Sequence, residues 1–391
     1  MIADQSSRHT AIEPTARAPG RRTSRTARTL PPVVKYLGSK RQLVPLIGEL
    51  ARRIPARTAC DLFAGTTRVG QELRRSGLVV HSNDLATYSE ALGQAYIAAD
   101  DVTLDRTRLR GLLAELGALP GRDGYVTRTF CEEARFFQPR NGRRIDAIRD
   151  AIDELDVTPI ERGALLTSLL EAADRVDSTC GLQMAYVKQW APRSRRDLEL
   201  REPAAVDGPP GTVTRLDALD LAPALTGTDL VYLDPPYNQH SYYSNYHVWE
   251  TLMRWDAPEA YGVARKRVDC RTTKSPFNRT REAWGALERL ITSLDAPWIV
   301  LSFSDEGFHD ARDLAGLLAD RGHVRAVTVE RPRYVGARIG IHDPAGNRVG
   351  TVSHVRNHET LWVVGPSAAA VAAVTAGLPG DDAAGPAARA A

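Results

Sequence analysis

Two stretches of this chain alternate strand-like and helix-like patterns, and a polar helical segment separates them. The first stretch covers residues 31–100, the second 212–365, and the segment between them 101–211. In the first, a helical pattern ends at Pro55, and a strand reaching Phe63, a glycine-containing turn, a helix and the strand Leu78–His81 follow. This order predicts a doubly wound, mostly parallel α/β sheet, which binds ligands beyond the carboxyl ends of its strands.

The second stretch supplies the other strands and helices of the predicted sheet. Its strand candidates are Leu230–Leu233, Trp298–Phe303, Val324–Val329 and Thr360–Val364, and its helix candidates are Trp284–Leu294 and Ala311–Asp320.

Both ends of the chain lack apolar periodicity. Residues 1–30 hold six arginines and two acids, which predicts a disordered basic arm, and an organelle transit peptide is the alternative. The Ala/Gly/Pro-rich residues 366–391 predict a disordered tail.

Composition excludes several classes of protein. With 43% hydrophobic and 25% charged residues, the chain can bury a core, and a disordered or fibrous protein is excluded. No apolar run approaches the roughly 18 residues needed to span a bilayer, so we expect no membrane association and a cytoplasmic location. The four cysteines form no CxxC pair and the histidines show no ligand spacing, so we expect no metal site.

The sequence Asp234-Pro235-Pro236-Tyr237 directly follows the predicted buried strand Leu230–Leu233. Two consecutive prolines cannot continue a strand or a helix, so the chain must leave the sheet rigidly with free carbonyl groups. The Asp234 carboxylate and the Pro235 carbonyl can accept hydrogen bonds from an exocyclic amino group, and the Tyr237 ring can stack on a planar base. The alternative is a proline-rich turn with a capping aspartate.

A second candidate site combines Asp61-Leu62-Phe63-Ala64-Gly65 with Ser82-Asn83-Asp84. Gly65 would let a ligand approach the backbone at a strand-to-helix turn, and Asp84 at the end of the next strand could accept from both hydroxyls of a ribose. Together they indicate a cofactor that contains adenosine. The alternatives are that Gly65 is a structural glycine of the turn and that Asp84 only caps a helix. The fingerprints GxGxxG and GxxxxGK[ST] are absent, which argues against NAD and against a nucleoside triphosphatase.

These motifs, together with Lys35-Tyr36-Leu37-Gly38-Ser39-Lys40 and in this order, resemble the Dam-like, DPPY-containing DNA N6-adenine methyltransferases. The resemblance covers residues 33–365 and implies a Rossmann-like methyltransferase fold that uses S-adenosylmethionine. It implies an insert, 101–211, for target recognition. The cofactor-binding residues it implies are Tyr36, Lys40, Asp61, Phe63, Gly65, Asp84 and Asp234, and the catalytic residues are Asp234, Pro235 and Tyr237. The family usually has FxGxG, but Thr67 stands here in place of the second glycine.

The implied reaction is methyl transfer to N6 of an adenine flipped out of double-stranded DNA at a specific site. A separate cognate restriction enzyme is a further partner that the sequence leaves open. Transfer to another planar amine is one alternative: cytosine N4, an RNA adenine or a protein glutamine. A DNA-binding protein without turnover is another. Asp rather than Ser or Asn before Pro-Pro-Tyr favours adenine in DNA.

Basic residues cluster at three places, and each cluster is either a set of phosphate contacts or a solvated face. One is the segment Gly262–Arg281, and the others lie at Arg135–Arg144 and Lys188–Arg196. The predicted DNA-binding residues are Arg140, Asn141, Arg143, Arg144, Lys274, Asn278 and Arg279. Arg265, Lys266, Arg267 and Arg271 are further candidates for backbone contacts. Of the aromatic group Tyr242, Tyr243, Tyr246 and Trp249, we expect half to line the base pocket and half to pack inside.

Overall fold

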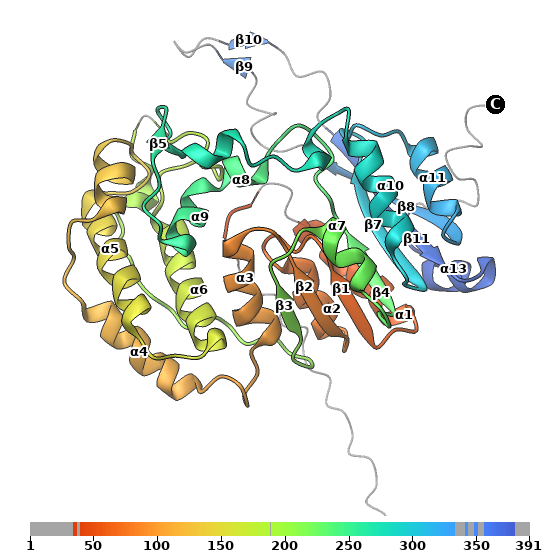
Figure 1. The fold of residues 1–391 in the computed structure, drawn as a ribbon, viewed down its shortest axis with the longest axis horizontal. Coiled ribbons are helices and arrows are strands. Elements are labelled where there is room, and N and C mark those ends of the chain that lie inside the picture. Colours follow the sequence, from red (N-terminus) through yellow and green to blue (C-terminus); the bar gives the residue numbers. More distant parts are fainter. Residues whose placement is uncertain are drawn as a thin grey trace, which may run out of the picture. The chain divides into compact units, whose positions relative to one another are not determined.

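A seven-stranded sheet in the order β3-β2-β1-β4-β7-β11-β8 organises the chain (Figure 1). The computed structural model describes residues 34–36, 40–187, 189–332, 341–342, 348–350 and 356–379. The strands are β1 (Thr58–Asp61), β2 (Val79–Asn83), β3 (Thr212–Thr214), β4 (Leu230–Leu233), β7 (Trp298–Ser304), β8 (His323–Pro332) and β11 (Arg356–Gly365). The first four and β7 run parallel, whereas β11 pairs antiparallel with β7 and β8. The predicted doubly wound, mostly parallel sheet is confirmed.

Helices cover both faces of this sheet. One face carries η1 (Lys40–Gln42), α1 (Val44–Arg53), α2 (Arg68–Arg75) and α13 (Ala368–Thr375). The other carries α7 (Ala218–Leu221), η5 (Ala222–Ala224), α10 (Ala283–Ser293) and α11 (Ala311–Ala319). All four residues of β4 are buried, and they alternate between the two cores: Leu230 and Tyr232 face one, Val231 and Leu233 the other. Burial on both sides explains why β4 is a continuous apolar run.

Helix α13 corrects the prediction of a disordered tail from Pro366. Its alanines favour a helix, and the side-chain oxygen of Ser367 caps it by accepting from the amide of Ala370 at 3.2 Å. Val371 and Val374 are buried against the sheet. The composition was therefore a poor guide here, because a few valines were enough to anchor an alanine-rich segment. The predicted basic arm, 1–30, and the last residues, 380–391, lie outside the described residues.

The segment 101–211 is helical, as predicted. It holds α4 (Arg106–Ala118), η3 (Thr127–Glu132), α5 (Pro139–Glu154), α6 (Pro159–Val176) and η4 (Pro192–Arg195), and it joins the sheet through α3 (Thr87–Gly93) and η2 (Gln94–Ala98). α6 begins with a capping box in which the Thr158 and Glu161 side chains bond to each other's backbone amides. None of the helices in the described part of the chain is long and apolar enough to cross a membrane.

A second segment, 242–271, packs with these helices although the sequence assigned it to the sheet domain. It contains α8 (Tyr242–Asn245), α9 (His247–Arg254), the hairpin of β5 (Ala260–Tyr261) and β6 (Lys266–Arg267), and η6 (Val268–Arg271). Tyr246, Trp249 and Leu252 are buried in the same core as α3, α5 and α6. η7 (Pro276–Asn278) follows it, and a second small hairpin pairs β9 (Ile341–His342) with β10 (Arg348–Gly350). The helical region is thus built from two separate parts of the chain.

The side chain of Arg74 ties the sheet to the start and the end of the 101–211 segment. It is 2% exposed, and its Nη1 donates to the carbonyls of Tyr96, Ile97 and Ala99 at 2.9, 3.0 and 2.8 Å. Its Nη2 lies 3.3 Å from the carbonyl of Gly208, where the chain returns to the sheet. Four carbonyl groups, two in the last turn of η2 and two in the loops beyond it, thus share one buried guanidinium.

We expect Arg74→Met to lower the free energy of unfolding by about 3 kcal/mol, because buried carbonyls would lose their donor. Denaturant unfolding of the purified protein measures this. Arg75→Met is the matched control, since the neighbouring Arg75 makes only a partly exposed ion pair with Glu72 and should cost less than about 1 kcal/mol. Equal losses in the two variants would contradict this role of Arg74.

Candidate active site

A pocket lies at the carboxyl ends of β1, β2 and β4, the place that a parallel sheet offers to ligands. All of the residues implied for the cofactor line it: Tyr36, Lys40, Asp61, Phe63, Gly65, Asp84 and Asp234. Phe277 and Asn278 of η7 and Tyr242 and Tyr243 of α8 line it as well. Leu37, Gly38 and Ser39 lie outside the described residues. The motifs, up to 200 positions apart in sequence, therefore meet in one pocket.

The turn after β1 brings the backbone close to the aromatic wall of the pocket. Gly65 has φ +51°, and a Cβ there would stand 3.2 Å from the Tyr36 hydroxyl. Thr67, in place of the second motif glycine, also has a left-handed φ of 58° and is fully buried. This conformation costs a β-branched residue about 1–2 kcal/mol. Its hydroxyl oxygen accepts from Gln71 Nε2 at 3.0 Å, which anchors it at the start of α2.

The carboxylate of Asp84 joins this turn to the start of α3. Its Oδ2 accepts from the amide of Gly65 at 2.8 Å and its Oδ1 from the amide of Ala86 at 2.9 Å. Burial raises the pKa of Asp84, and these two amide hydrogen bonds oppose the rise. The helix-cap alternative for Asp84 is wrong, because the N-cap residue of α3 is Ala86 and no side chain caps that helix. Asp84 instead holds the backbone before the helix and lines the pocket.

Asp61, at the end of β1, has one carboxylate oxygen without a partner among the described residues. It is 1% exposed, its Oδ2 accepts from the amide of Gly70 at 2.8 Å, and its Oδ1 is buried with no partner among the described residues. Burial raises the pKa of Asp61 to about 7. The Gly70 amide opposes this rise, and the charges of Asp234 and Asp84 add to it. A cation in the pocket would satisfy the spare oxygen and relieve the repulsion.

Asp234 follows β4 and faces a buried lysine. Lys40 is 5% exposed, and its Nζ lies 3.0 Å from Asp234 Oδ1. The same ammonium also pairs with Glu359 of β11. Burial alone would lower the pKa of Lys40, but the charges of Asp234 and Glu359 outweigh burial and hold that pKa above its usual range. The sequence did not single out Glu359. The sequence does contain a signal for Glu359: it is a charged residue that alternates with Leu361 and Val363 and so lies on the same face of the strand.

The other motif residues after β4 lie beside the pocket. Pro236 lines it, and the Tyr237 ring packs at a tilt against Phe303 with 5.5 Å between centroids. Lys40 Nζ lies 5.8 Å from the Tyr237 ring centre. The Tyr237 carbonyl accepts from the amide of Phe308 at 2.9 Å, which fixes the backbone of the loop. Pro235 and Tyr237 are not among the lining residues, so the motif borders the pocket on one side only.

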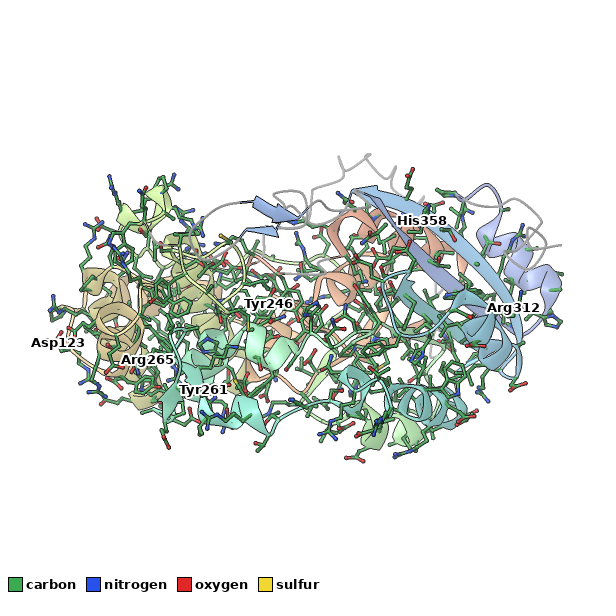
Figure 2. All side chains as sticks on the ribbon, turned by 90° about the horizontal axis from the view of Figure 1, so that it is seen from above. Asp123, Tyr246, Tyr261, Arg265, Arg312 and His358 are labelled. Carbon is green, nitrogen blue, oxygen red and sulfur yellow. The ribbon has the colours of Figure 1, made fainter. Side chains whose placement is uncertain are left out.

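Four stacked rings run from the pocket into the helical core. Tyr36 stacks on Tyr242 and on Tyr246 with centroids 5.4 and 4.5 Å apart, and Tyr246 stacks on Trp249 at 4.6 Å. Tyr242 and Tyr243 line the pocket, whereas Tyr246 and Trp249 are 0% and 2% exposed. Tyr246 lies near the middle of the view in Figure 2. The expectation that half of this group packs inside is confirmed.

Of the predicted DNA-binding residues of α5, Arg140 and Arg143 are exposed, Arg144 is half-buried and Asn141 is buried. The prediction is wrong for Asn141, which is 1% exposed. Its amide donates to the carbonyl of Arg196 at 2.9 Å and accepts from the amide of Leu198 at 3.0 Å. The side chains of Arg140 and Arg143 are about half exposed and pair with Asp197 and Asp123. Arg144 donates to the carbonyl of Gly117 at 2.6 Å. Arg140 and Arg143 thus remain accessible, and Asn141 supports the loop before β3.

The predicted residues of the second cluster border the pocket. Asn278 lines it, and its side-chain amide donates to the carbonyl of Asn238 at 2.8 Å, which links η7 to the loop after Tyr237. Lys274 is exposed, and Arg279 pairs with Glu282 at 2.9 Å on the surface. Asn278 thus lines the pocket, and the two accessible charges, Lys274 and Arg279, are chain neighbours of lining residues.

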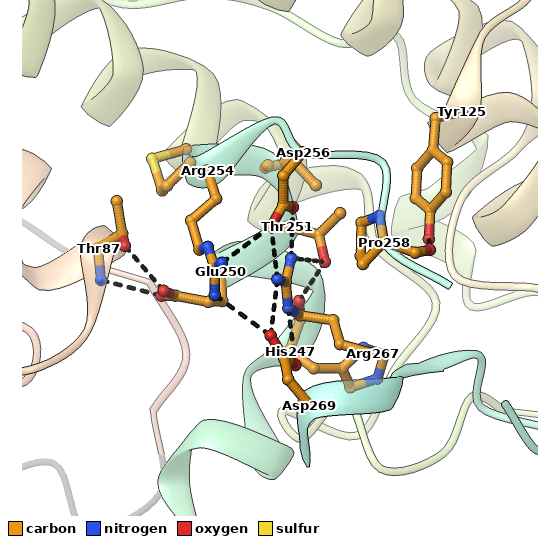
Figure 3. A network of polar contacts seen from close by, with 12 residues as sticks. Thr87, Tyr125, His247, Glu250, Thr251, Arg254, Asp256, Pro258, Arg267 and Asp269 are labelled. Atoms are coloured by element: carbon orange, nitrogen blue, oxygen red, sulfur yellow. Dashed lines mark hydrogen bonds and ion pairs between the residues drawn. The ribbon is translucent and has the colours of Figure 1, made fainter. Parts of the chain in front are cut away.

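Arg267 is a structural residue, which corrects its assignment to the DNA backbone. It is 1% exposed, and its guanidinium binds Asp256 at two oxygens, each at 2.7 Å, and Asp269 at 2.9 Å (Figure 3). The hydroxyl of Tyr243, a pocket residue, donates to Asp269 at 2.9 Å. Arg254 pairs with both aspartates. The network holds the hairpin β5–β6 against α9, and it leaves Arg267 no capacity for phosphate.

The pocket fits S-adenosylmethionine on its own chemistry. Four aspartates (Asp61, Asp84, Asp217 and Asp234) line it against two basic residues, Arg68 and the Lys40 that two carboxylates engage. The Oδ1 of Asp61 is buried without a partner in the described part of the chain. Such a surplus of acceptors suits a ligand with a sulfonium and an ammonium group. The aromatic wall of Tyr36 and Tyr242 offers faces for a planar ring.

Comparison with known proteins agrees with this geometry. A family model described as D12 class N6 adenine-specific DNA methyltransferase matches residues 36–295, most of the chain. The chain belongs to this family. It is a site-specific DNA adenine methyltransferase that uses S-adenosylmethionine. Cytosine, RNA and protein glutamine as substrates are thereby set aside, as is a binding protein without turnover.

Three relatives in this family are modification enzymes. The chain is 30% identical over 316 residues to type II methyltransferase M.NlaIII from Neisseria lactamica, covering 77% of this chain and 92% of that protein. Type II methyltransferase M.CviAII from Paramecium bursaria Chlorella virus 1 is 28% identical over 77% of this chain and 92% of its own length. Modification methylase StsI from Streptococcus sanguinis is 29% identical over 73% of this chain, which spans about half of that relative, 46%.

We expect the affinity for S-adenosylmethionine to rise about tenfold between pH 5.5 and 7.5. Asp61 has a pKa of about 7 in the free protein, so below that pH a bound cation must displace its proton, and above it the carboxylate is ready. Isothermal titration calorimetry at several pH values measures this. Asp61→Asn should bind more weakly and lose most of the pH dependence. An unchanged pH dependence in this variant would assign the effect to another group.

Proposed function

We propose that Asp234, Pro235 and Tyr237 act directly on the target adenine of this methyltransferase. The observation that carries the proposal is the position of the Asp234 carboxylate, at the end of β4 and in the wall of the pocket that fits the cofactor. When bound, S-adenosylmethionine supplies an electrophilic methyl group on a sulfonium sulfur. The Asp234 carboxylate and the Pro235 carbonyl accept the two N–H groups of the adenine amine, and so direct the nitrogen lone pair toward the cofactor side of the pocket.

Tyr237 and the stacked tyrosines compensate for taking the base out of the duplex. Flipping a base costs a few kcal/mol, and stacking on one aromatic ring returns roughly 1–3 kcal/mol. Tyr237 is held by Phe303 on its side and by the Phe308 amide at its carbonyl. Burial raises the pKa of Tyr237 to about 12, so its hydroxyl stays neutral in the working pH range. The ring therefore serves as an apolar surface without adding a charge.

We assign the cofactor roles to the residues of the same pocket. Asp84 accepts from the ribose hydroxyls while its amide partners hold it in place, and Asp61 accepts from the ammonium group. Tyr36 closes the side that faces the helical region, and Lys40 closes the side that carries Asp234 and Glu359. Gly65 and Phe63 form the turn that the cofactor approaches, and the left-handed Thr67 keeps that turn in the shape that a second glycine would adopt.

DNA would bind on the side of the helical region and the segment 242–279. Arg140, Arg143, Lys274 and Arg279 offer accessible charge there, and the 101–211 insert would read the target sequence. The type II names of two relatives suggest a separate restriction enzyme that cuts the same site when it is unmethylated. Such an enzyme would work with genomic DNA in the cytoplasm.

Single-molecule methylome sequencing of a host that expresses the gene tests the function as a whole. We expect N6-methyladenine at one short sequence, present with the intact gene and absent with an Asp234 variant. Methylation at cytosine, or no methylation in a host that contains folded protein, would contradict it.

We expect Asp234→Asn to lower kcat at least tenfold and to leave DNA affinity within about threefold. The substitution keeps the size of the side chain but removes a charged hydrogen bond worth about 1.5–3 kcal/mol. Tritiated methyl transfer and fluorescence anisotropy measure the two effects. Asp220→Asn, on the exposed part of α7, is the control and should match the wild type. A variant that keeps most of its kcat would remove Asp234 from the reaction.

We expect Lys274→Gln and Arg279→Gln each to reduce the salt dependence of DNA binding by roughly 0.9 in log–log slope, as for one lost phosphate contact. Affinity should fall alike on cognate and non-cognate duplexes. Arg312→Gln is the control, because Arg312 is exposed on α11 at the end of the molecule away from Asp123 and Arg265 (Figure 2). A slope that changes only in the control would place the DNA on another surface.

A further inference from the structure

The sheet topology places Glu359 beside the reaction site, although it lies 125 positions after Asp234. β4, β7 and β11 are adjacent, and Glu359 pairs in register with Ser304 of β7. Side chains alternate along strands, so Glu359 shares a face with Leu361, and Tyr232 lies on that same face with Asp234 two positions on. Lys40 of η1 reaches this face and lies between the two carboxylates.

Glu359 is a largely buried carboxylate, so it does not serve as a solvent-exposed surface charge. Its side chain is 12% exposed, and Ser302 Oγ lies 3.5 Å from the Oε1 that contacts Lys40. The charged and titratable groups around the ammonium are Asp234, Glu359, Tyr232 and Tyr237. A buried carboxylate is costly unless a cation pairs with it, and here two carboxylates share one cation. A single aspartate would already neutralise Lys40, so the second carboxylate needs another explanation.

We propose that Glu359 is a positioning residue that holds the Lys40 ammonium when the target adenine engages Asp234. This inference rests on the proposed role of Asp234. Before adenine enters, Lys40 Nζ forms an ion pair with Asp234 Oδ1. The proposed role of Asp234 requires a carboxylate oxygen that accepts a hydrogen bond from the adenine amine. Without Glu359, a hydrogen bond from the adenine amine to Asp234 Oδ1 would displace Lys40 and leave its buried ammonium unpaired. With Glu359, the ammonium keeps a carboxylate partner, and Asp234 exchanges one donor for another.

The exchange also accounts for the strength of Asp234 as an acceptor. A carboxylate that is fully paired with an ammonium is a weaker acceptor for a neutral amine, because part of its charge is already compensated. Glu359 shares the positive charge of Lys40 and so leaves more negative charge on Asp234. The Lys40–Glu359 ion pair would thus strengthen the hydrogen bond from the adenine amine to Asp234 without contacting the adenine.

The test compares Glu359→Gln with the wild type on a duplex that carries the site found by methylome sequencing. We expect kcat to fall at least tenfold, while KM for DNA and for S-adenosylmethionine stays within threefold. Glu359→Asp should recover part of the loss, since it restores the charge at a slightly greater distance. Glu330→Gln is the matched control, an exposed carboxylate on the neighbouring strand β8, and should behave as the wild type. An unchanged kcat in Glu359→Gln overturns the proposal.

A binding measurement separates positioning from a merely structural role. Fluorescence anisotropy without cofactor compares a duplex with adenine at the target position and one with purine, which lacks the amine. The wild type should bind the adenine duplex more tightly, and Glu359→Gln should reduce this ratio at least threefold. In a Lys40→Met background, Glu359→Gln should have no further effect on the ratio, and an equal effect in both backgrounds overturns the proposal.

The two hypotheses fail in different ways. If the wild type does not methylate adenine, the proposed function fails. If it does methylate adenine but Glu359→Gln matches it in kcat and in the adenine-to-purine ratio, only the role of Glu359 fails. Thermal unfolding of each variant confirms that it is folded. Should Glu359→Gln not fold, Glu359→Asp carries the test, and wild-type values for kcat and the ratio in that variant overturn the proposal.

Discussion

Four carboxylates and one ammonium crowd together at the carboxyl edge of the sheet, and this electrostatic imbalance governs the rest of the site. β1 ends in Asp61, Asp84 and Asp234 directly follow the parallel strands β2 and β4, and antiparallel β11 adds Glu359. Burial and mutual repulsion raise the pKa of Asp61 and, through burial, that of Asp84, while Lys40 is held strongly protonated. Such a site is unfavourable until a cation enters. The geometry therefore selects a positively charged cofactor before any specific contact is made.

The wall opposite the sheet is fixed from the helical side. Tyr243 borders the pocket and donates to Asp269, which Arg267 and Arg254 hold in turn. Tyr36 and Tyr242 continue into the core through Tyr246 and Trp249. The pocket thus has one wall of charge on the sheet and one wall of stacked rings on the helices. Under the proposed function, a planar base with an exocyclic amine would use both walls at once, since its faces stack and its edge donates.

Much of the sheet and of the pocket could be predicted from the sequence, because both rest on local signals. β4 has the predicted bounds, since four apolar residues before two prolines leave no alternative. The predictions that failed concern residues whose environment depends on contacts between distant parts of the chain. Asn141 and Arg267 were assigned to DNA by their neighbours in sequence, but each has partners from other loops that bury it. Glu359 fell one residue before the predicted strand Thr360–Val364, so its place on the inner face of the sheet was not seen. In α13 a few buried valines outweighed an alanine-rich composition.

The helical region draws on two separate lengths of chain, 101–211 and 242–271, and this has a consequence for how target preference could change in related enzymes. Exchange of the first length alone would set a foreign surface against part of the core that Tyr246, Trp249 and Leu252 share with α3, α5 and α6. The chain between the two lengths carries β4 and the catalytic motif. Under the proposed role of the helical region, a change of target preference that replaces 101–211 also calls for compensating changes in 242–271, on the other side of the Asp234–Tyr237 motif.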